Sequence, residues 1–74
     1  MSRLIKMDRS GHTVVAEWRP TDPPGVAHAA AALREELEHG YIAVVATGPG
    51  LAEQVQALPD GEAQVILRRP IAGG

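Results

Sequence analysis

The chain contains no cysteine and no phenylalanine, and it has one tryptophan and one tyrosine. Without cysteine the fold cannot be held by disulfides, and the protein can form neither its own thioester nor a thiolate metal site. We expect a cytoplasmic location by default. Because aromatic residues are so scarce, the core must be built from aliphatic side chains.

Long apolar runs and strong charge are also missing. No stretch approaches the roughly 20 residues of a membrane span, and the first apolar residues are far too few for a signal peptide. The net charge of −2 gives no electrostatic case for binding nucleic acid or an anionic membrane. We therefore expect no nucleic-acid partner, no membrane partner and a monomer.

The length of 74 residues predicts one domain with one small core, stable by a few kcal/mol. Hydrophobic residues make up 45% of the chain, which argues against intrinsic disorder. We expect residues 1–70 to form the folded domain and residues 71–74 to be a flexible diglycine tail.

The order of predicted elements is strand, strand, helix, strand, short element, strand. The short element, residues 51–58, is ambiguous, because its apolar residues have helical spacing while its centre alternates like an edge strand. The predicted strands are residues 3–8, 12–18, 41–46 and 63–69.

The first two strands flank a turn at residues 8–11. Both faces of this hairpin carry apolar residues, so alternation does not identify the core face. Trp18 either belongs to the core or joins Leu4 and Val14 in an exposed partner-binding patch, and we favour the core. The implied pairs are Asp8–His12, Met7–Thr13 and Ile5–Val15, with Leu4, Val14, Ala16 and Trp18 on the other face.

A helix is predicted after the proline-rich stretch, with Thr21 or Asp22 as its cap and Gly40 as its stop. Pro23 or Pro24 fits the first turn. The charged residues are interpreted as a solvated face rather than as catalytic acids. The apolar stripe is Val26, Ala30, Leu33 and Leu37, and the charged side is Arg34, Glu35, Glu36 and Glu38.

This order indicates an α+β domain in which one helix crosses one face of a mixed sheet. A β-grasp fold satisfies it in under 80 residues, with the first and last strands parallel and adjacent at the centre of the sheet. A ferredoxin-like fold would need a second substantial helix, and residues 51–58 are too short for one.

The end of the chain, Asp60 to Gly74, combines Asp-Gly, a strand-like run and Pro-Ile-Ala-Gly-Gly. It resembles the sulfur-carrier proteins of thiamine and molybdopterin synthesis, which belong to the ubiquitin-like β-grasp proteins. In that comparison Val65 and Leu67 match core leucines of ubiquitin's last strand. Arg69 departs from the sulfur carriers, which usually have proline there.

The whole chain also resembles small bacterial ubiquitin-like proteins. The residues that carry this likeness are 7–13, Trp18 and 37–43. The resemblance implies three partners: an adenylating activating enzyme, a conjugating enzyme and a deconjugating zinc peptidase. It further implies target proteins or a sulfur acceptor as the final recipients.

The resemblance implies that the protein is a substrate and carrier, not an enzyme, and that it holds no cofactor. The partner enzyme would use ATP to adenylate the Gly74 carboxylate, for conjugation to target amines or for sulfur carriage as a thiocarboxylate. Gly73 would thread a narrow channel, because glycine has no side chain. Tail and partner recognition would fall to Arg68, Arg69, Pro70, Ile71 and Ala72.

One alternative remains beside this interpretation. The chain could be a non-covalent interaction module, such as a phage or secretion-system subunit, that ends incidentally in diglycine. A metal site is not expected, because His28 and His39 lie about 16 Å apart on the predicted helix and the usual ligand cluster is missing.

Overall fold

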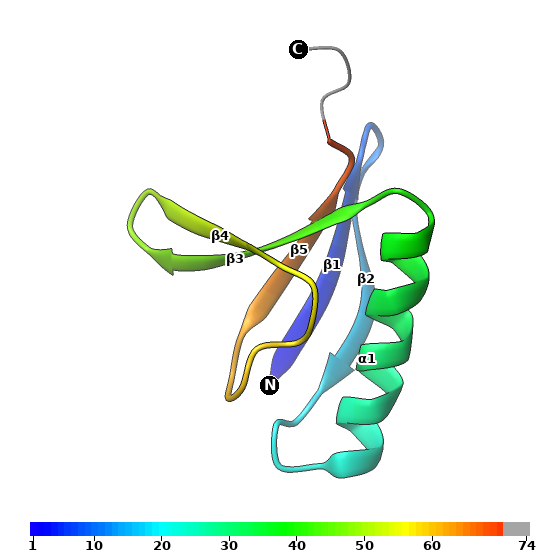
Figure 1. Ribbon diagram of the computed structural model, residues 1–74, viewed down its shortest axis with the longest axis vertical. Helices are drawn as coiled ribbons and strands as arrows, with labels where there is room; N and C mark the ends of the chain where they lie inside the picture. The colour runs from blue at the N-terminus through cyan, green and yellow to red at the C-terminus, as the bar shows by residue number, and fades with distance from the viewer. Residues whose placement is uncertain (71–74) are drawn as a thin grey trace.

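The computed structural model describes residues 1–70, which form five strands and one helix. The helix lies against one side of the sheet (Figure 1), so the predicted α+β class with one helix on a mixed sheet is confirmed. The elements are β1 (Ser2–Asp8), β2 (Gly11–Trp18), α1 (Pro23–Glu38), β3 (Ile42–Gly48), β4 (Leu51–Val55) and β5 (Gln64–Arg68).

The strands are ordered β2-β1-β5-β3-β4 across the sheet. β1 and β5 pair in parallel, while every other neighbouring pair is antiparallel. The first and last strands are therefore adjacent at the centre, as predicted. This is the one parallel pair in the described sheet, and α1 is part of the connection that separates its two strands in sequence.

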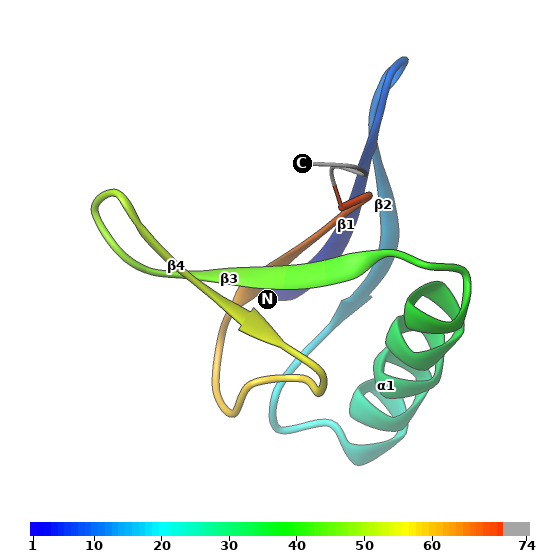
Figure 2. The same cartoon turned by 45° about the horizontal axis from the view of Figure 1, so that its top comes forward.

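The ambiguous element, residues 51–58, contains a strand and no helix. β4 pairs with β3 across a turn in which Gly50 has a φ of +72°, a value that favours glycine. The β3–β4 hairpin extends away from the helix (Figure 2), and β4 forms one edge of the sheet. Alternation at Gln54-Val55-Gln56 was thus the correct signal, and the helical spacing of the apolar residues was misleading.

The predicted register of the first hairpin is wrong by one residue. Asp8 lies opposite Gly11, Ile5 lies opposite Val14, and the ladder then shifts so that Leu4 lies opposite Ala16. The shift is a β-bulge that leaves one extra residue on β2. Because a one-residue change reverses the face of a side chain, Val14 does not share the face of Leu4 and is 44% exposed.

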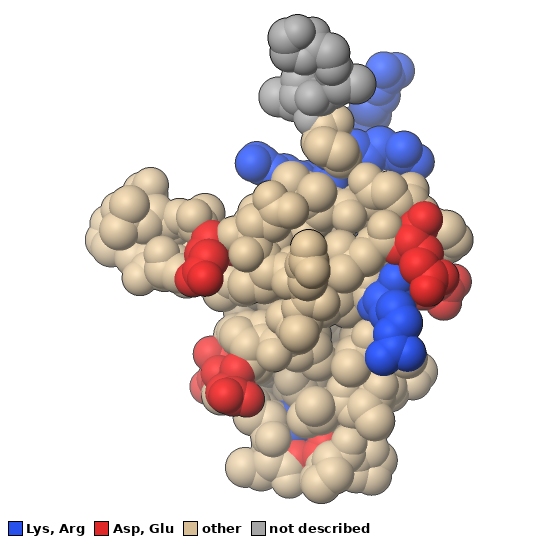
Figure 3. All heavy atoms as spheres, viewed as in Figure 1, with Lys and Arg blue, Asp and Glu red and all other residues tan. Residues whose placement is uncertain are grey.

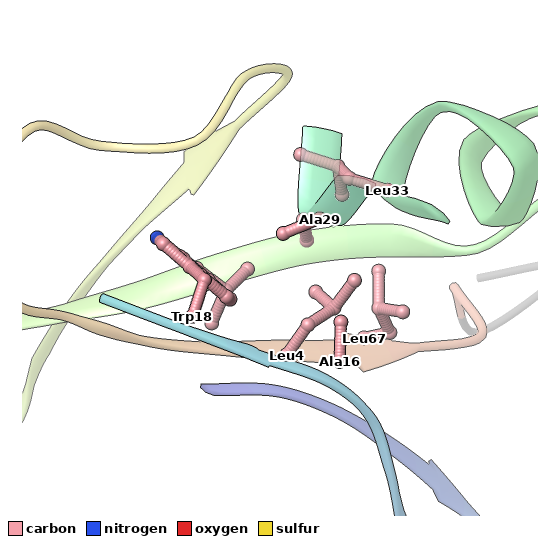
Figure 4. Packing of buried hydrophobic residues seen from close by; sticks show 8 residues of the cluster. Leu4, Ala16, Trp18, Ala29, Leu33 and Leu67 are labelled. Atoms are coloured by element: carbon pink, nitrogen blue, oxygen red, sulfur yellow. The ribbon is translucent and has the colours of Figure 1, made fainter. Parts of the chain in front are cut away.

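The core lies between the sheet and α1. Leu4 and Leu67 point from the strands toward Leu33 on the helix (Figure 4), and Trp18 belongs to the same core cluster. Each of these four residues is at most 3% exposed. The core position of Trp18 is therefore confirmed. Burial of these apolar groups is the main favourable term in the stability of so small a domain.

The helix stripe is confirmed in part. Leu33 is buried, whereas Val26 and Leu37 are partly buried and pack against the core. Ala29, which the stripe omitted, has no exposed surface because it faces the sheet. Both prolines lie in the first turn, and Asp22 is the N-cap residue, although its side chain makes no capping hydrogen bond.

The helix ends as expected. His39 is its C-cap residue, and Gly40 follows with a φ of +95°, which a residue with a Cβ rarely adopts. The described part of the chain holds no helix with the length and apolar character that a membrane span requires.

Candidate partner-binding end of the sheet

The residues predicted to react or to recognise a partner fall into two groups. Arg68 ends β5, and Arg69 and Pro70 follow it, all three exposed. The other four, Ile71, Ala72, Gly73 and Gly74, lie outside the described residues. The structure therefore places the chain up to residue 70, directly before these four residues.

The fold brings a turn from the start of the chain to this point. Since β1 and β5 run parallel, the carboxyl end of β1 lies beside the end of β5, with Lys6 opposite Leu67. Met7 and Asp8, which end β1, and the turn with Arg9 follow this last β1–β5 pair and lie beside the end of β5. We call this region the exit end, and it consists of Lys6, Met7, Asp8, Arg9, Ser10, Tyr41, Arg68, Arg69 and Pro70.

Positive charge is concentrated at the exit end. Lys6, Arg9, Arg68 and Arg69 are four of the seven lysine and arginine residues in the chain. Figure 3 shows basic side chains gathered where the described chain stops, with acidic side chains mostly farther down. The exit end therefore suits an acidic surface, although the whole chain has a net charge of −2.

Tyr41, directly before β3, organises two of these cations. The Arg69 guanidinium lies 4.9 Å from the centre of the Tyr41 ring, and the Lys6 ammonium lies 5.3 Å from it. At these distances each cation is attracted by the negative face of the ring. The ring therefore helps to fix the direction of Arg69, one residue before Pro70.

Lys6 is also paired with the helix. Its Nζ lies 3.2 Å from a carboxylate oxygen of Glu36, and Nδ1 of His39 lies 3.6 Å from the other oxygen. Glu36 is 9% exposed, so its interpretation as part of a solvated face is wrong. A carboxylate at this depth needs a compensating charge, which Lys6 supplies from β1.

The sheet face opposite the helix carries an apolar row across four strands. The registers place Val14 beside Ile5, Ile5 beside Ile66, and Ile66 beside Val44. Of these four residues Val14 is 44% exposed, whereas Ile66 and Val44 are half-buried and Ile5 is buried. The exposed apolar surface of the row is therefore centred on Val14, at the β2 edge of the sheet.

A groove lies between the first hairpin and the end of β5. Its volume is about 660 Å³, and we call it the exit groove. Met7 and the Tyr41 ring provide apolar surface, while Arg9 and Arg69 provide positive charge. The residues that line it are Met7, Asp8, Arg9, Ser10, Tyr41 and Arg69.

The carboxylate of Asp8 lines the exit groove, and it accepts hydrogen bonds within the turn. The hydroxyl of Ser10 donates a hydrogen bond to Oδ1 of Asp8 at 2.7 Å, and the Ser10 backbone N–H donates another at 2.9 Å. These bonds, the hydroxyl bond first, lower the pKa of Asp8 below its ordinary value. At neutral pH Asp8 is therefore ionised, and its carboxylate stabilises the turn through these two hydrogen bonds.

We expect Ser10→Ala to raise the pKa of Asp8 partway toward its ordinary value, because the stronger hydrogen bond is lost and the backbone bond remains. The measurement is an NMR titration of the Asp8 side chain in both proteins. The lowered pKa of Asp8 favours folding above the pKa of the unfolded chain, and this contribution disappears as pH falls through the folded-state pKa. An unchanged Asp8 titration in Ser10→Ala would contradict this assignment.

Residues 1–70 contain no group of three histidine, aspartate or glutamate side chains that could hold an ion. His39 lies beside Glu36, the carboxylate that also pairs with Lys6.

Of the exit end, Arg68, Arg69 and Pro70 were predicted as site residues from the sequence, whereas Lys6, Arg9 and Tyr41 were not. The predicted parallel pairing of the first and last strands by itself implies that residue 9 and residue 69 share one end of the sheet. Tyr41 was predicted as the first residue of a buried strand, because the residues after it are apolar. In the structure it directly precedes β3.

No protein-family model, curated protein sequence or solved structure matches this chain.

Proposed function

We propose that this chain is a ubiquitin-like β-grasp protein whose Gly74 carboxylate is adenylated by a partner enzyme. The element order, the single helix and the central parallel pair support the β-grasp assignment. The observation that carries the function is the exit end, where four basic residues surround the point from which the chain continues to Gly73 and Gly74.

The chemistry would proceed in two steps. A carboxylate oxygen of Gly74 attacks the α-phosphorus of ATP and displaces pyrophosphate, which gives an acyl-adenylate. A nucleophile then attacks the glycine carbonyl and releases AMP. A target amine would give an amide, and a sulfur donor would give a thiocarboxylate.

The described residues would contribute binding and orientation to this reaction. Arg69, held over Tyr41, and the neighbouring Arg68 would meet acidic groups of the enzyme, and Pro70 would stiffen the chain that follows. Orientation matters because a reaction between a carboxylate and a phosphate needs the two groups aligned. The test is ATP–pyrophosphate exchange with a candidate activating enzyme.

Lys6 should be a poor acceptor for self-conjugation. It is the sole lysine in the chain, and its ammonium is paired with the buried Glu36 carboxylate. We expect a reconstituted conjugation reaction to form no extended ladder on a gel, in either the native chain or Lys6→Arg. The N-terminal amine is blocked by acetylation in both, so that Lys6 is the amine under test.

The contrary result is a ladder that forms in the acetylated native chain and disappears in Lys6→Arg. It would show that Lys6 leaves Glu36 readily enough to react. A Glu36→Gln variant provides the comparison, because it removes the carboxylate charge and should increase acylation of Lys6 by a small activated ester.

The exposed apolar side chain of Val14, beside the half-buried residues of its row, favours a second function, a non-covalent interaction module. Such a module would need no reaction at Gly74. Pyrophosphate exchange separates the two functions, because a module would support none, and a gene for an adenylating enzyme beside this one would favour the first function.

A further inference from the structure

The exit groove combines two kinds of wall. Met7 is 45% exposed although it is a large apolar side chain, and it faces the same hollow as the Tyr41 ring. Exposed apolar surface next to charge is typical of a place where another molecule binds. The exit groove is therefore a candidate binding site.

Arg9 and Arg69 are not paired with a carboxylate in the part of the chain that the structure describes. Asp8, the acidic residue in the wall, is ionised, but its carboxylate accepts two hydrogen bonds from Ser10 and forms an ion pair with neither arginine. Arg9 and Arg69 therefore present guanidinium groups to whatever enters the groove.

We propose that the exit groove binds an acidic peptide segment of a partner protein, with carboxylates meeting Arg9 and Arg69 and an aliphatic side chain resting on Met7 and Tyr41. Guanidinium groups suit this role because they match the geometry of a carboxylate with two parallel hydrogen bonds. The inference deepens the proposed function by giving the partner's chemistry, and it rests on that function for the partner's identity.

A nucleotide fits the groove less well than a peptide. A nucleobase would need a face of the Tyr41 ring, yet two cations of the chain already lie over that ring, at 4.9 Å and 5.3 Å. An aliphatic side chain needs only the ring edge and the thioether of Met7.

The test is an NMR titration of the isotope-labelled full chain with the peptide acetyl-Glu-Glu-Leu-Glu-Glu-amide at low salt. We expect saturable shifts at the amides of Met7, Arg9, Tyr41 and Arg69, and weaker binding when salt is raised, because exposed charges are screened. Arg9→Gln should weaken binding about fivefold, as expected for one exposed ion pair. Arg19→Gln, which removes the same charge from the exposed loop before α1, should leave binding unchanged.

The result that overturns the proposal is an absence of saturable shifts, or equal weakening by Arg9→Gln and Arg19→Gln. Shifts of the same amides by ATP but not by the peptide would also overturn it and would indicate a nucleotide site. The titration contains no activating enzyme, so peptide binding without pyrophosphate exchange leaves the groove assigned and rejects adenylation. Exchange without peptide binding supports adenylation and rejects the groove as a peptide site.

Discussion

Deleting Gly73 and Gly74 should abolish ATP–pyrophosphate exchange with the activating enzyme. The deletion removes the proposed reacting carboxylate and the two residues thin enough to carry it into a narrow channel. The core of the domain lies in residues 4–67, so the free energy of unfolding should change by less than about 0.5 kcal/mol. Exchange assays and urea unfolding of both proteins provide the measurements.

A second variant separates the loss of the tip from the loss of a carboxylate. Gly74→Trp keeps the chain length and a terminal carboxylate but adds the largest side chain, so it should fail in the same assay. Equal exchange from the native chain and from either variant would reject Gly74 as the reacting residue. The interaction module would then be the better account of the protein.

Leu33→Ala should destabilise the domain by about 2–5 kcal/mol. Leu33 is 2% exposed and lies between α1 and the sheet, so truncation leaves a cavity as well as losing apolar contact. The free energy of unfolding of a domain of this size is only a few kcal/mol, so a large share of the molecules should unfold. Thermal and urea unfolding measure the effect.

Leu51→Ala is the matched control for this prediction. It removes the same atoms from a side chain that is 64% exposed on β4, and we expect a change within about 0.5 kcal/mol. Similar losses from both substitutions would mean that burial against α1 does not determine the stability of the domain. An unchanged melting temperature in Leu33→Ala would remove the assigned helix face.

The element order and the central strand pair could be predicted because strong local signals mark each boundary. Pro23 and Gly40 bracket the helix, and the apolar run at Val65 and Leu67 identifies the last strand. The hairpin register could not be predicted in the same way, because both faces carry apolar residues. The bulge opposite Leu4 and Ile5 then decided which face Val14 occupies.

The candidate site was predicted only where residues are adjacent in sequence. Arg68 and Arg69 stand out beside the tail, whereas Tyr41 and Lys6 join them through the sheet. Glu36 was misread because its neighbours Glu35 and Glu38 are exposed, and helical position alone did not reveal that Lys6 lies across from it. Long-range pairing of this kind needs the three-dimensional arrangement.

The central position of β5 has a consequence for biosynthesis. Arg3 and Gln64 pair across 61 positions of the sequence, and β5 also separates β1 from β3. While only β1 to β4 and the helix have emerged from the ribosome, β5 is still missing. The β1–β2 hairpin and the β3–β4 hairpin then cannot join into one sheet, because β5 lies between β1 and β3. The sheet therefore closes late, in one step over nearly the whole domain, when residues 64–68 leave the exit tunnel.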